Sequence, residues 1–295
     1  MKCYLCGSQN QAIFDCVESF GFALVYYQCE TCGLIFQSSE QSQAGDPDFY
    51  AETYRKIYQN SETPTAKDLW VQEQRAAHLV QLVKGYLPGG PKRALDIGAS
   101  TGTLLAAYNQ AFGTDGVGVE PGDAYRAHAE ARGLRMVDSL DRLLEENGEC
   151  FELVSLIHVL EHLPDPVSTL RTIREKLLAP NGLLLVEVPN FYAHDSYELA
   201  HLSCFTAHSL RAVLEQAGFD VKEILRHGAP RSAVLNLYLT AAVMPLPEGA
   251  PLPPVIPDRK MRLKRKISFL YRRGVQKLLP HRAWLPLPGD AELRQ

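Results

Sequence analysis

The chain has 295 residues, 46% of them hydrophobic, which is enough to bury one sizeable core and leave residues for small appendages. No run of 18 or more uncharged apolar residues occurs, and the first residues lack the apolar stretch of a signal peptide, so we expect a cytoplasmic protein. The net charge of −4 is uneven, because the residues from Asp258 onward carry 11 of the 30 Lys and Arg but only 3 of the 34 acidic residues.

Four of the seven cysteines stand in two close pairs near the N-terminus. Cys3, Cys6, Cys29 and Cys32 have the spacing C-x2-C-x22-C-x2-C, which predicts a tetrahedral zinc ion held by four thiolates. Such a set leaves no open position for a substrate, so the zinc would be structural. Residues 1–38 are therefore predicted to form a small zinc ribbon, the alternative being four buried cysteines without a metal.

Residues 39–90 are predicted to form a helical cap and linker. Tyr50, Tyr54 and Tyr58 recur every four residues, as on one face of a helix. Apolar residues from Ala66 to Leu87 keep a period of 3.6, and the segment PGGP at 88–91 ends that helix. The main domain should begin near residue 91.

Short apolar strands alternate with helical patterns through the main domain, residues 91–242. This alternation predicts an α/β fold with a doubly wound, mostly parallel, seven-stranded sheet. We expect helices from Thr103, Asp123, Asp141 and Pro166 and over 209–217, and strands at 93–97, 116–120, 134–137, 152–157, 183–188, 219–225 and 233–242.

The end of the chain changes in composition. Residues 243–257 carry six prolines and are predicted to form a stiff linker. Residues 258–295 follow as a basic amphipathic helix and tail, with Leu263, Ile267, Leu270 and Tyr271 on one face. This helix could pack on the acidic body, lie on an anionic membrane, or hold an anionic substrate.

A turn of small residues follows the first strand of the main domain. The segment ALDIGASTG, residues 94–102, is an apolar strand that runs into this turn and then into a helix. Such a turn lets the backbone approach a nucleotide-type ligand at the carboxyl edge of the sheet. Glu120 ends the next strand, where a carboxylate can accept hydrogen bonds from both hydroxyls of a ribose.

S-adenosylmethionine (SAM) fits this turn better than a dinucleotide. A dinucleotide fingerprint requires glycine at positions 98, 100 and 103, and the chain has Gly98, Ser100 and Thr103. The carboxylate of Asp96 suits the cationic α-amino group of SAM and would repel a pyrophosphate. The sequence therefore predicts SAM as the cofactor.

These segments resemble the class I SAM-dependent methyltransferases. LDIGASTG is similar to their first motif, VGVEP contains the ribose-binding acid, and FELVSLIHVLEHLPDP and LLAPNGLLLVEVPN resemble the fourth and fifth strands with their flanking segments. HLSCFTAHSLRAVLEQAGF is similar to the segment before the sixth strand. With the N-terminal ribbon, the chain resembles zinc-ribbon methyltransferases of polysaccharide and natural-product biosynthesis, including sugar C-methyltransferases.

The resemblance implies a Rossmann-like methyltransferase fold and a set of cofactor-binding residues. It places Asp138 or Ser139, just after the third strand, near the adenine; alternatively, Asp138 caps the next helix. The expected cofactor-binding residues are Asp96, Gly98, Ala99, Ser100, Gly102, Glu120, Asp138, Ser139 and His158.

Histidines near the strand ends are the candidates for acid-base chemistry. Histidine titrates near neutrality, as a general base should, and a base is needed if the acceptor is a hydroxyl or a carbon acid. His158, Glu161 and His162 follow the fourth strand, and His201 follows the fifth. We expect His201 to be the general base, although Glu161 and His162 could instead cap or brace the next helix.

The acceptor site is predicted from position alone, and other functions stay open. Asn190, Tyr192 and Tyr197 follow the fifth strand and are expected to bind the acceptor, a small molecule, glycan or nucleotide sugar. One alternative is RNA methylation assisted by a metal on His158, Glu161, His162 and His201, as in small-RNA 2′-O-methyltransferases. The acidic body argues against nucleic acid. Another alternative is a SAM-binding protein without catalysis.

Overall fold

The structure, a computed structural model, describes residues 2–19, 21–37, 63–146, 150–195 and 197–287. The tyrosines at 50, 54 and 58 lie outside these ranges, so their predicted helix is not described. Within the described residues the larger sheet has seven strands: β4 (Arg93–Ile97), β5 (Asp115–Val119), β6 (Arg135–Val137), β7 (Phe151–Ile157), β8 (Leu178–Pro189), β10 (Phe219–His227) and β11 (Tyr238–Pro245).

The order of these strands is β10-β11-β8-β7-β4-β5-β6. Neighbouring strands from β6 to β8 are parallel, and β11 runs antiparallel to both β8 and β10. The predicted seven-stranded, mostly parallel sheet is confirmed. Two boundaries are wrong: β8 begins at Leu178 and not at residue 183, and the last strand begins at Tyr238 and not at residue 233, because residues 228–237 form a turn and loop.

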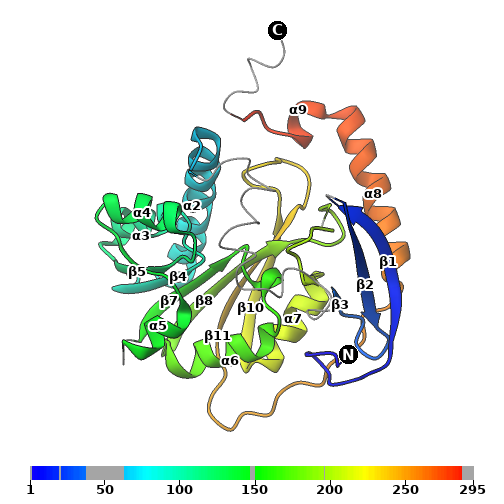
Figure 1. The fold of residues 1–295 in the computed structure, drawn as a ribbon, viewed down its shortest axis with the longest axis horizontal. Helices are drawn as coiled ribbons and strands as arrows, with labels where there is room; N and C mark the ends of the chain where they lie inside the picture. Colours follow the sequence, from blue (N-terminus) through cyan, green and yellow to red (C-terminus); the bar gives the residue numbers. More distant parts are fainter. Residues whose placement is uncertain (1, 20, 38–62, 147–149, 196, 288–295) are drawn as a thin grey trace.

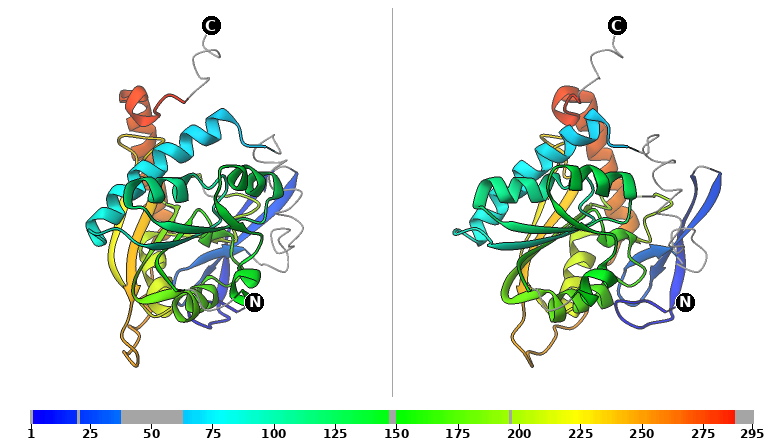
Figure 2. Two further views of the ribbon diagram at one scale, coloured as in Figure 1. Left: turned by 90° about the vertical axis from the view of Figure 1, so that its left-hand side faces the viewer. Right: turned by 60° about the vertical axis from the view of Figure 1, so that its left-hand side comes forward.

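Helices cover both faces of this sheet (Figures 1 and 2). On one face, α2 (Ala66–Tyr86) and α3 (Thr103–Phe112) bury apolar side chains against Leu153, Leu183 and Leu185. The opposite face carries α5 (Leu140–Glu145), α6 (Pro166–Lys176) and α7 (Ala207–Gln216). The central strands are therefore buried on both sides, which explains their nearly continuous apolar sequences.

Side-chain caps start the helices that border the site. Thr65 and Asp68 form a capping box at the start of α2, and Thr206 and Ser209 do the same for α7. Asp165 caps α6, where Pro166 occupies the first turn. The remaining helix beside the sheet, α4 (Asp123–Ala131), buries Tyr125 and Ala129. The caps satisfy amide groups that a helix start leaves without partners.

The N-terminal segment forms a second, four-stranded sheet within the described residues. Its strands are β1 (Gln11–Ser19), β2 (Phe22–Cys29), β3 (Ile35–Gln37) and β9 (Ser203–Cys204), in that order. The last strand comes from the loop after β8, so the N-terminal unit is completed by a piece of the main domain. A boundary drawn at residue 38 alone therefore misses this shared sheet.

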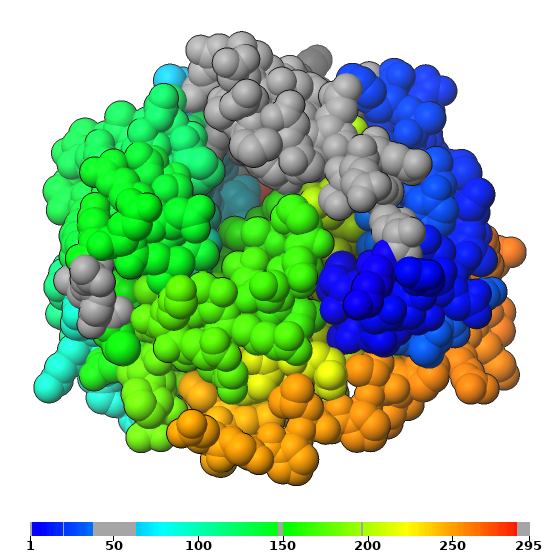
Figure 3. Space-filling view, turned by 60° about the horizontal axis from the view of Figure 1, so that its bottom comes forward, coloured from blue at the N-terminus to red at the C-terminus, as the bar shows by residue number. Residues whose placement is uncertain are grey.

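The segment after β11 returns along the main domain to the N-terminal unit, as Figure 3 shows. It reaches Asp258, whose amide N–H donates to Cys32 O at 3.0 Å. The chain then enters α8 (Met261–Leu278), which lies beside β1 and β2, and α9 (Pro280–Ala283) (Figure 1). None of the helices in the described ranges is long and apolar enough to cross a bilayer.

Candidate functional site

The turn between β4 and α3 requires glycine at two positions. Gly98 has φ 76° and Gly102 has φ 69°, in the left-handed region that side chains disfavour. A Cβ at Gly98 would lie 2.4 Å from Val159 Cγ2, and one at Gly102 would lie 2.3 Å from Leu134 Cδ1. The turn between β4 and α3 therefore packs directly against Val159, the residue that follows His158.

A glutamine on α2 holds the middle of this turn. Gln72 Nε2 donates to Ser100 Oγ at 3.3 Å, and Thr101 Oγ1 donates to Gln72 Oε1 at 2.5 Å. Ser100 has φ 51°, an unusual conformation for a residue with a side chain, and these bonds help to fix it. The sequence analysis missed Gln72, because a polar residue on a helix gives no signal of a contact with a distant turn.

Glu120, just after β5, closes the turn from the other side. Its carboxylate is buried and accepts the amide N–H of Ser100 at 2.9 Å and that of Gly122 at 2.7 Å. The structure therefore brings Gly98, Ala99, Ser100, Gly102 and Glu120 into one constellation, as their sequence positions predicted.

Asp96 lies on β4, behind the turn. Its side chain is buried, and the hydroxyl of Ser155 donates to Asp96 Oδ1 at 2.6 Å. Burial raises the pKa of Asp96 to about 7; the Ser155 hydrogen bond opposes this shift and the nearby charge of Glu120 adds to it. A cation at the turn would favour the ionised form of this carboxyl.

Asp138 and Ser139 lie after β6, at the start of α5. Ser139, and not Asp138, is the N-cap, since its hydroxyl accepts the amide N–H of Arg142 at 3.3 Å. Asp138 accepts a hydrogen bond from Ser139 and forms an ion pair with Arg142 at 3.0 Å, interactions that lower the pKa of its carboxyl. Their contact with adenine stays a prediction.

A pocket of about 210 Å³ lies at the carboxyl edge of the sheet, among residues that follow β7 and β8. Its lining is dominated by titratable side chains: Arg75, His158, Glu161, His162, Pro189, His194, Glu198, His201 and Tyr238. The four predicted catalytic residues therefore meet in one pocket, although about 40 residues separate them in the chain. Ligands in open α/β sheets bind at this edge.

His158 is held between two buried carboxylates. Its Nε2 lies 3.2 Å from Glu187 Oε1, and its Nδ1 lies 3.3 Å from Glu161 Oε1. Burial and the Arg75 charge act to lower the pKa of His158, but the two glutamates outweigh them and raise it. Both ring nitrogens of His158 therefore face buried carboxylates, which favour its protonated form and make it a poor general base.

Glu187 on β8 is a residue that the sequence analysis missed. Its carboxylate is fully buried and, besides His158, has three partners. Arg75 Nε lies 2.9 Å away, His227 Nε2 lies 3.3 Å away, and the hydroxyl of Thr240 donates to it at 2.8 Å. These partners outweigh burial and keep its pKa well below the usual range. The available signal was one acidic residue inside the apolar strand LLLVEVP.

His162 and His201 face each other, with ring centroids 5.0 Å apart. His162 Nδ1 donates to the carbonyl of Ala200 at 2.9 Å, so its Nε2 is the basic nitrogen. Burial lowers the pKa of His162 to about 4. His201 is only 4% exposed, with Nε2 3.4 Å from Glu198 Oε2, so it does not lie in an open polar loop as expected.

Two carboxylates, those of Glu161 and Glu198, complete the pocket, and their pKa values are shifted in opposite directions. Burial acts to raise the pKa of Glu161, but His158 and the other imidazoles lower it to about 2. Burial raises the pKa of Glu198 to about 7, the imidazole of His162 opposing the shift. Ligand atoms of Glu161, His162 and His201 lie within 4.8 Å of one another, a spacing that could hold a metal ion.

The predicted acceptor residues do not line this pocket. Asn190 Nδ2 donates to Asn236 O at 2.8 Å, and its side-chain oxygen accepts the amide N–H of Tyr192. The hydroxyl of Tyr192 donates to Asp258 Oδ2, and Tyr197 packs on Tyr26 with ring centroids 4.6 Å apart. All three support the loop after β8, and Glu198 and Tyr238 take the positions at the pocket that were expected for them.

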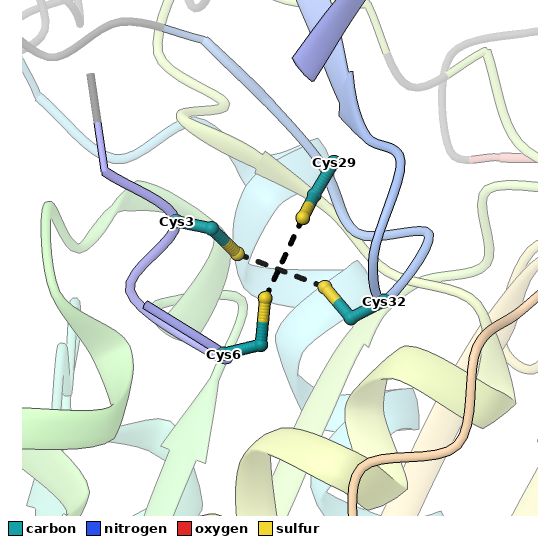
Figure 4. A group of neighbouring side chains, drawn as sticks. All are labelled: Cys3, Cys6, Cys29 and Cys32. Atoms are coloured by element: carbon teal, nitrogen blue, oxygen red, sulfur yellow. Dashed lines mark hydrogen bonds between the residues drawn. The ribbon is translucent and has the colours of Figure 1, made fainter. Parts of the chain in front are cut away.

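The four N-terminal cysteines point their sulfur atoms at one centre (Figure 4). Sγ of Cys3 lies 3.7 Å from Sγ of Cys32, Sγ of Cys6 lies 3.5 Å from Sγ of Cys29, and all four lie within 4.8 Å of one another. A tetrahedron with Zn–S bonds of 2.3 Å has edges of about 3.8 Å. The donor set and its spacing fit zinc.

The two cysteine pairs lie in two separate backbone turns of the same kind. Gly7 N donates to Cys3 O and Gly33 N to Cys29 O, both at 2.8 Å, and both glycines have positive φ. Gly33 is further restricted, since a Cβ there would lie 2.4 Å from Asp258 O. The cysteine cluster is therefore braced by the segment that leads into α8.

The family comparison agrees with this geometry. A family model described as "Methyltransferase domain" matches residues 71–224, just over half of the chain. A Ubiquinone biosynthesis O-methyltransferase of Actinobacillus pleuropneumoniae is 32% identical over 111 residues, which cover 34% of this chain and 46% of that protein. The same enzyme of Cereibacter sphaeroides is 34% identical over 128 residues, 41% of this chain and 51% of that protein. The chain spans about half the length of the curated relatives it matches.

Solved structures show the same fold. The Burkholderia thailandensis 1,6-didemethyltoxoflavin-N1-methyltransferase, solved with 1,6-didemethyltoxoflavin and S-adenosylhomocysteine bound, has a TM-score of 0.53 and 19% sequence identity. The similarity covers 81% of this chain and all of that one.

Proposed function

The chain belongs to the family of methyltransferase domains, and we propose that it transfers the methyl group of SAM to a small-molecule or glycan acceptor. The observation that carries the proposal is the contact between the two parts of the site. Gly98 of the turn packs on Val159, and the nearby residues His158, Glu161 and His162 form a wall of the pocket. A cofactor at the turn and an acceptor in the pocket would be neighbours.

The residues of the turn fit SAM group by group. Glu120, already an acceptor for two amide groups, offers its carboxylate to the ribose hydroxyls, and Asp96 provides a carboxyl for the α-amino group. Gly98 and Gly102, both with positive φ, allow the tight backbone turn that such a ligand would approach. SAM, when bound, supplies an electrophilic methyl group on a sulfonium.

We assign the acceptor atom to a hydroxyl oxygen and the general base to His201. The relatives described above are O-methyltransferases, and a hydroxyl needs a base as it attacks. The acceptor oxygen forms a bond to the methyl carbon, the carbon–sulfur bond breaks with its electron pair left on sulfur, and His201 takes the hydroxyl proton. Glu198, 3.4 Å from His201 Nε2, stabilises the resulting imidazolium.

The other charges of the pocket orient this base and the acceptor. In its protonated form, which Glu161 and Glu187 favour, His158 attracts the electron-rich acceptor oxygen. His162, with a pKa lowered to about 4, stays neutral at physiological pH and accepts a hydrogen bond through Nε2. A polar acceptor such as a sugar or a nucleotide sugar, as in polysaccharide biosynthesis, suits a pocket with this lining.

The cysteine cluster fits a structural zinc ion. Cys3, Cys6, Cys29 and Cys32 would hold it as thiolates, and four such ligands leave no position for a substrate. The ion would fix both backbone turns and, through Asp258 N–H on Cys32 O, the start of α8. Its role is to attach the N-terminal sheet to the loop after β8.

A second candidate, RNA methylation assisted by a divalent metal, has one observation in its favour: ligand atoms of Glu161, His162 and His201 lie within 4.8 Å of one another. This alternative requires that activity follow the metal and that Glu161→Gln abolish it. A SAM-binding protein without catalysis, the remaining alternative, requires binding without turnover.

The experiment that tests the proposed function measures methyl transfer directly. Purified protein is incubated with tritiated SAM and panels of nucleotide sugars, glycans, phenols and RNA, and His201→Gln is compared with wild type. The proposal expects transfer to one hydroxylated small-molecule or glycan class and loss of turnover in His201→Gln with SAM affinity kept. Transfer to RNA alone, or unchanged turnover in the variant, contradicts it.

A further inference from the structure

The helix α8 presents its apolar side to solvent. Leu263, Ile267, Leu270, Tyr271 and Leu278 are each between 54% and 78% exposed. Of the ten large hydrophobic side chains that are exposed in the described residues, seven lie between residues 263 and 284. Single exposed leucines need no explanation, but this concentration on one element does.

The side of α8 that faces the protein carries two arginines as well as the apolar Met261 and Val275. Arg265 lies over the rings of Phe191, Tyr197 and Phe269 at 4.1, 4.8 and 4.6 Å, and Arg272 lies over Trp284 at 5.2 Å. Arg272 also donates to Ala193 O at 3.0 Å and pairs with Asp195. An ordinary surface helix buries most of its large apolar side chains, whereas α8 leaves five of them exposed and turns two arginines towards the protein.

Basic residues border the exposed apolar face. At 100° per residue, the five apolar side chains fall in an arc of roughly 100°. Lys266, Arg273 and Lys277 follow on one edge of this arc and Lys264 on the other, all exposed. The helix contains no acidic residue. We name the exposed face formed by these nine side chains the α8 face.

We propose that the α8 face docks on an anionic lipid membrane. Its leucines, isoleucine and tyrosine would enter the boundary between headgroups and acyl chains, and Lys266, Arg273 and Lys277 would contact lipid phosphates. Trp284 lies beyond the end of α8, packs against Arg272 and is 37% exposed, so its emission can report on docking. The commitment to anionic lipid rests on this charge complementarity around an apolar arc.

The α8 face is held rigidly, so docking needs no unfolding. Asp258 is buried and accepts Lys264 Nζ at 2.5 Å and the hydroxyl of Thr206 at 3.0 Å. Arg262 lies 4.4 Å from the centroid of Phe14 and donates to Ile13 O on β1. These contacts at the start of the helix, with those of Arg265 and Arg272 farther along it, fix which side faces outward before any membrane is met.

Vesicle flotation of the full chain tests the proposal. Vesicles of phosphatidylcholine alone are compared with vesicles that also contain phosphatidylglycerol. We expect binding to the anionic vesicles only, decreasing with salt, and a partition coefficient at least about tenfold lower in Ile267→Ser/Leu270→Ser and in Lys266→Glu/Arg273→Glu. Trp284 emission, read in Trp70→Phe, should shift to the blue on binding.

Matched controls separate the α8 face from general effects. Leu252→Ser/Ile256→Ser removes two exposed apolar side chains elsewhere, and Lys84→Glu/Lys176→Glu makes the same change in net charge on α2 and α6. Both should bind like wild type. Circular dichroism confirms that every variant is folded.

Three results would overturn the proposal. The first is a wild-type chain that does not float with anionic vesicles, and the second is an equal loss in the control variants. The third is a dimer by light scattering that disappears in Ile267→Ser/Leu270→Ser, since the α8 face would then bind a second copy. None of these results bears on methyl transfer, which is measured without lipid.

Discussion

A methyl group added at Gly98 probes the junction between cofactor turn and pocket. In Gly98→Ala, the new carbon would lie 2.4 Å from Val159 Cγ2 at a residue with φ 76°. The left-handed conformation costs alanine about 1–2 kcal/mol, and moving Val159 brings the total loss in unfolding free energy to about 2–4 kcal/mol. Because Val159 adjoins His158, the shift should also misplace the pocket wall.

Gly113→Ala is the matched control, since Gly113 has φ 70° but nothing within 4 Å of its added carbon. It should lose only the conformational part, about 1–2 kcal/mol, and keep cofactor affinity. For Gly98→Ala we expect a SAM dissociation constant and a turnover each at least about tenfold worse. Urea denaturation measures the unfolding free energy, calorimetry the SAM dissociation constant, and the tritium assay the turnover. Equal losses of stability in both variants, with unchanged SAM binding, would refute this reasoning.

Further predictions concern charge, metal and acid. Glu187→Gln leaves Arg75 and His158 without their buried counter-charge, so the unfolding free energy measured in urea should fall by about 3–5 kcal/mol. A loss under about 1 kcal/mol, typical of a surface ion pair, would contradict the role assigned to Glu187. Cys29→Ser should purify with less than one zinc per chain by mass spectrometry, while Cys16→Ser, exposed and outside the cluster, should keep it; equal zinc in both would rule out the four-thiolate site. Because burial lowers the pKa of His162 to about 4, the unfolded state binds more protons below pH 6.5, so stability should fall from pH 6.5 towards 4, by about 3 kcal/mol for this residue. His162→Gln should flatten that slope, and an unchanged slope would show that His162 is not responsible. Chelation with EDTA should leave methyl transfer intact once structural zinc is retained; transfer restored only by added Mg²⁺ or Mn²⁺ would favour the metal-assisted alternative.

The sequence predicted the central strands and the turn after β4, because neighbouring residues alone identify these elements. Apolar runs on both faces predicted the central strands within a few residues, and the small residues from 98 to 102 predicted the turn. Ser100 and Glu120, 20 residues apart, were placed together because consecutive parallel strands end at the same edge. His158 and His201 met for the same reason.

Residues that act through distant partners were missed. Gln72 and Arg75 lie on α2, where polar residues are typical of a solvated face, yet both reach the site. Glu198 carries no motif, and the two-residue strand β9 is too short for any periodic pattern. Asn190, Tyr192 and Tyr197 were assigned from their place after β8 alone, and packing against β2, Asn236 and Asp258 directs them elsewhere.

The orientation of α8 was likewise not predictable from the sequence. Amphipathicity predicted a helix near the correct residues, but not which side faces the protein. Arg265 and Arg272 face inward because aromatic side chains from the loop after β8, from α8 itself and from residue 284 accept them. No sequence period reports such a set of contacts.

Binding of SAM to the purified chain tests the central claim most directly. Isothermal titration calorimetry compares wild type with Glu120→Gln, whose amide offers one acceptor to the two N–H groups of Ser100 and Gly122, and with Glu145→Gln, an exposed control. We predict one SAM per chain, affinity at least about tenfold weaker in Glu120→Gln, and no change in the control. Absence of SAM binding, or equal affinity in all three proteins, would contradict the account.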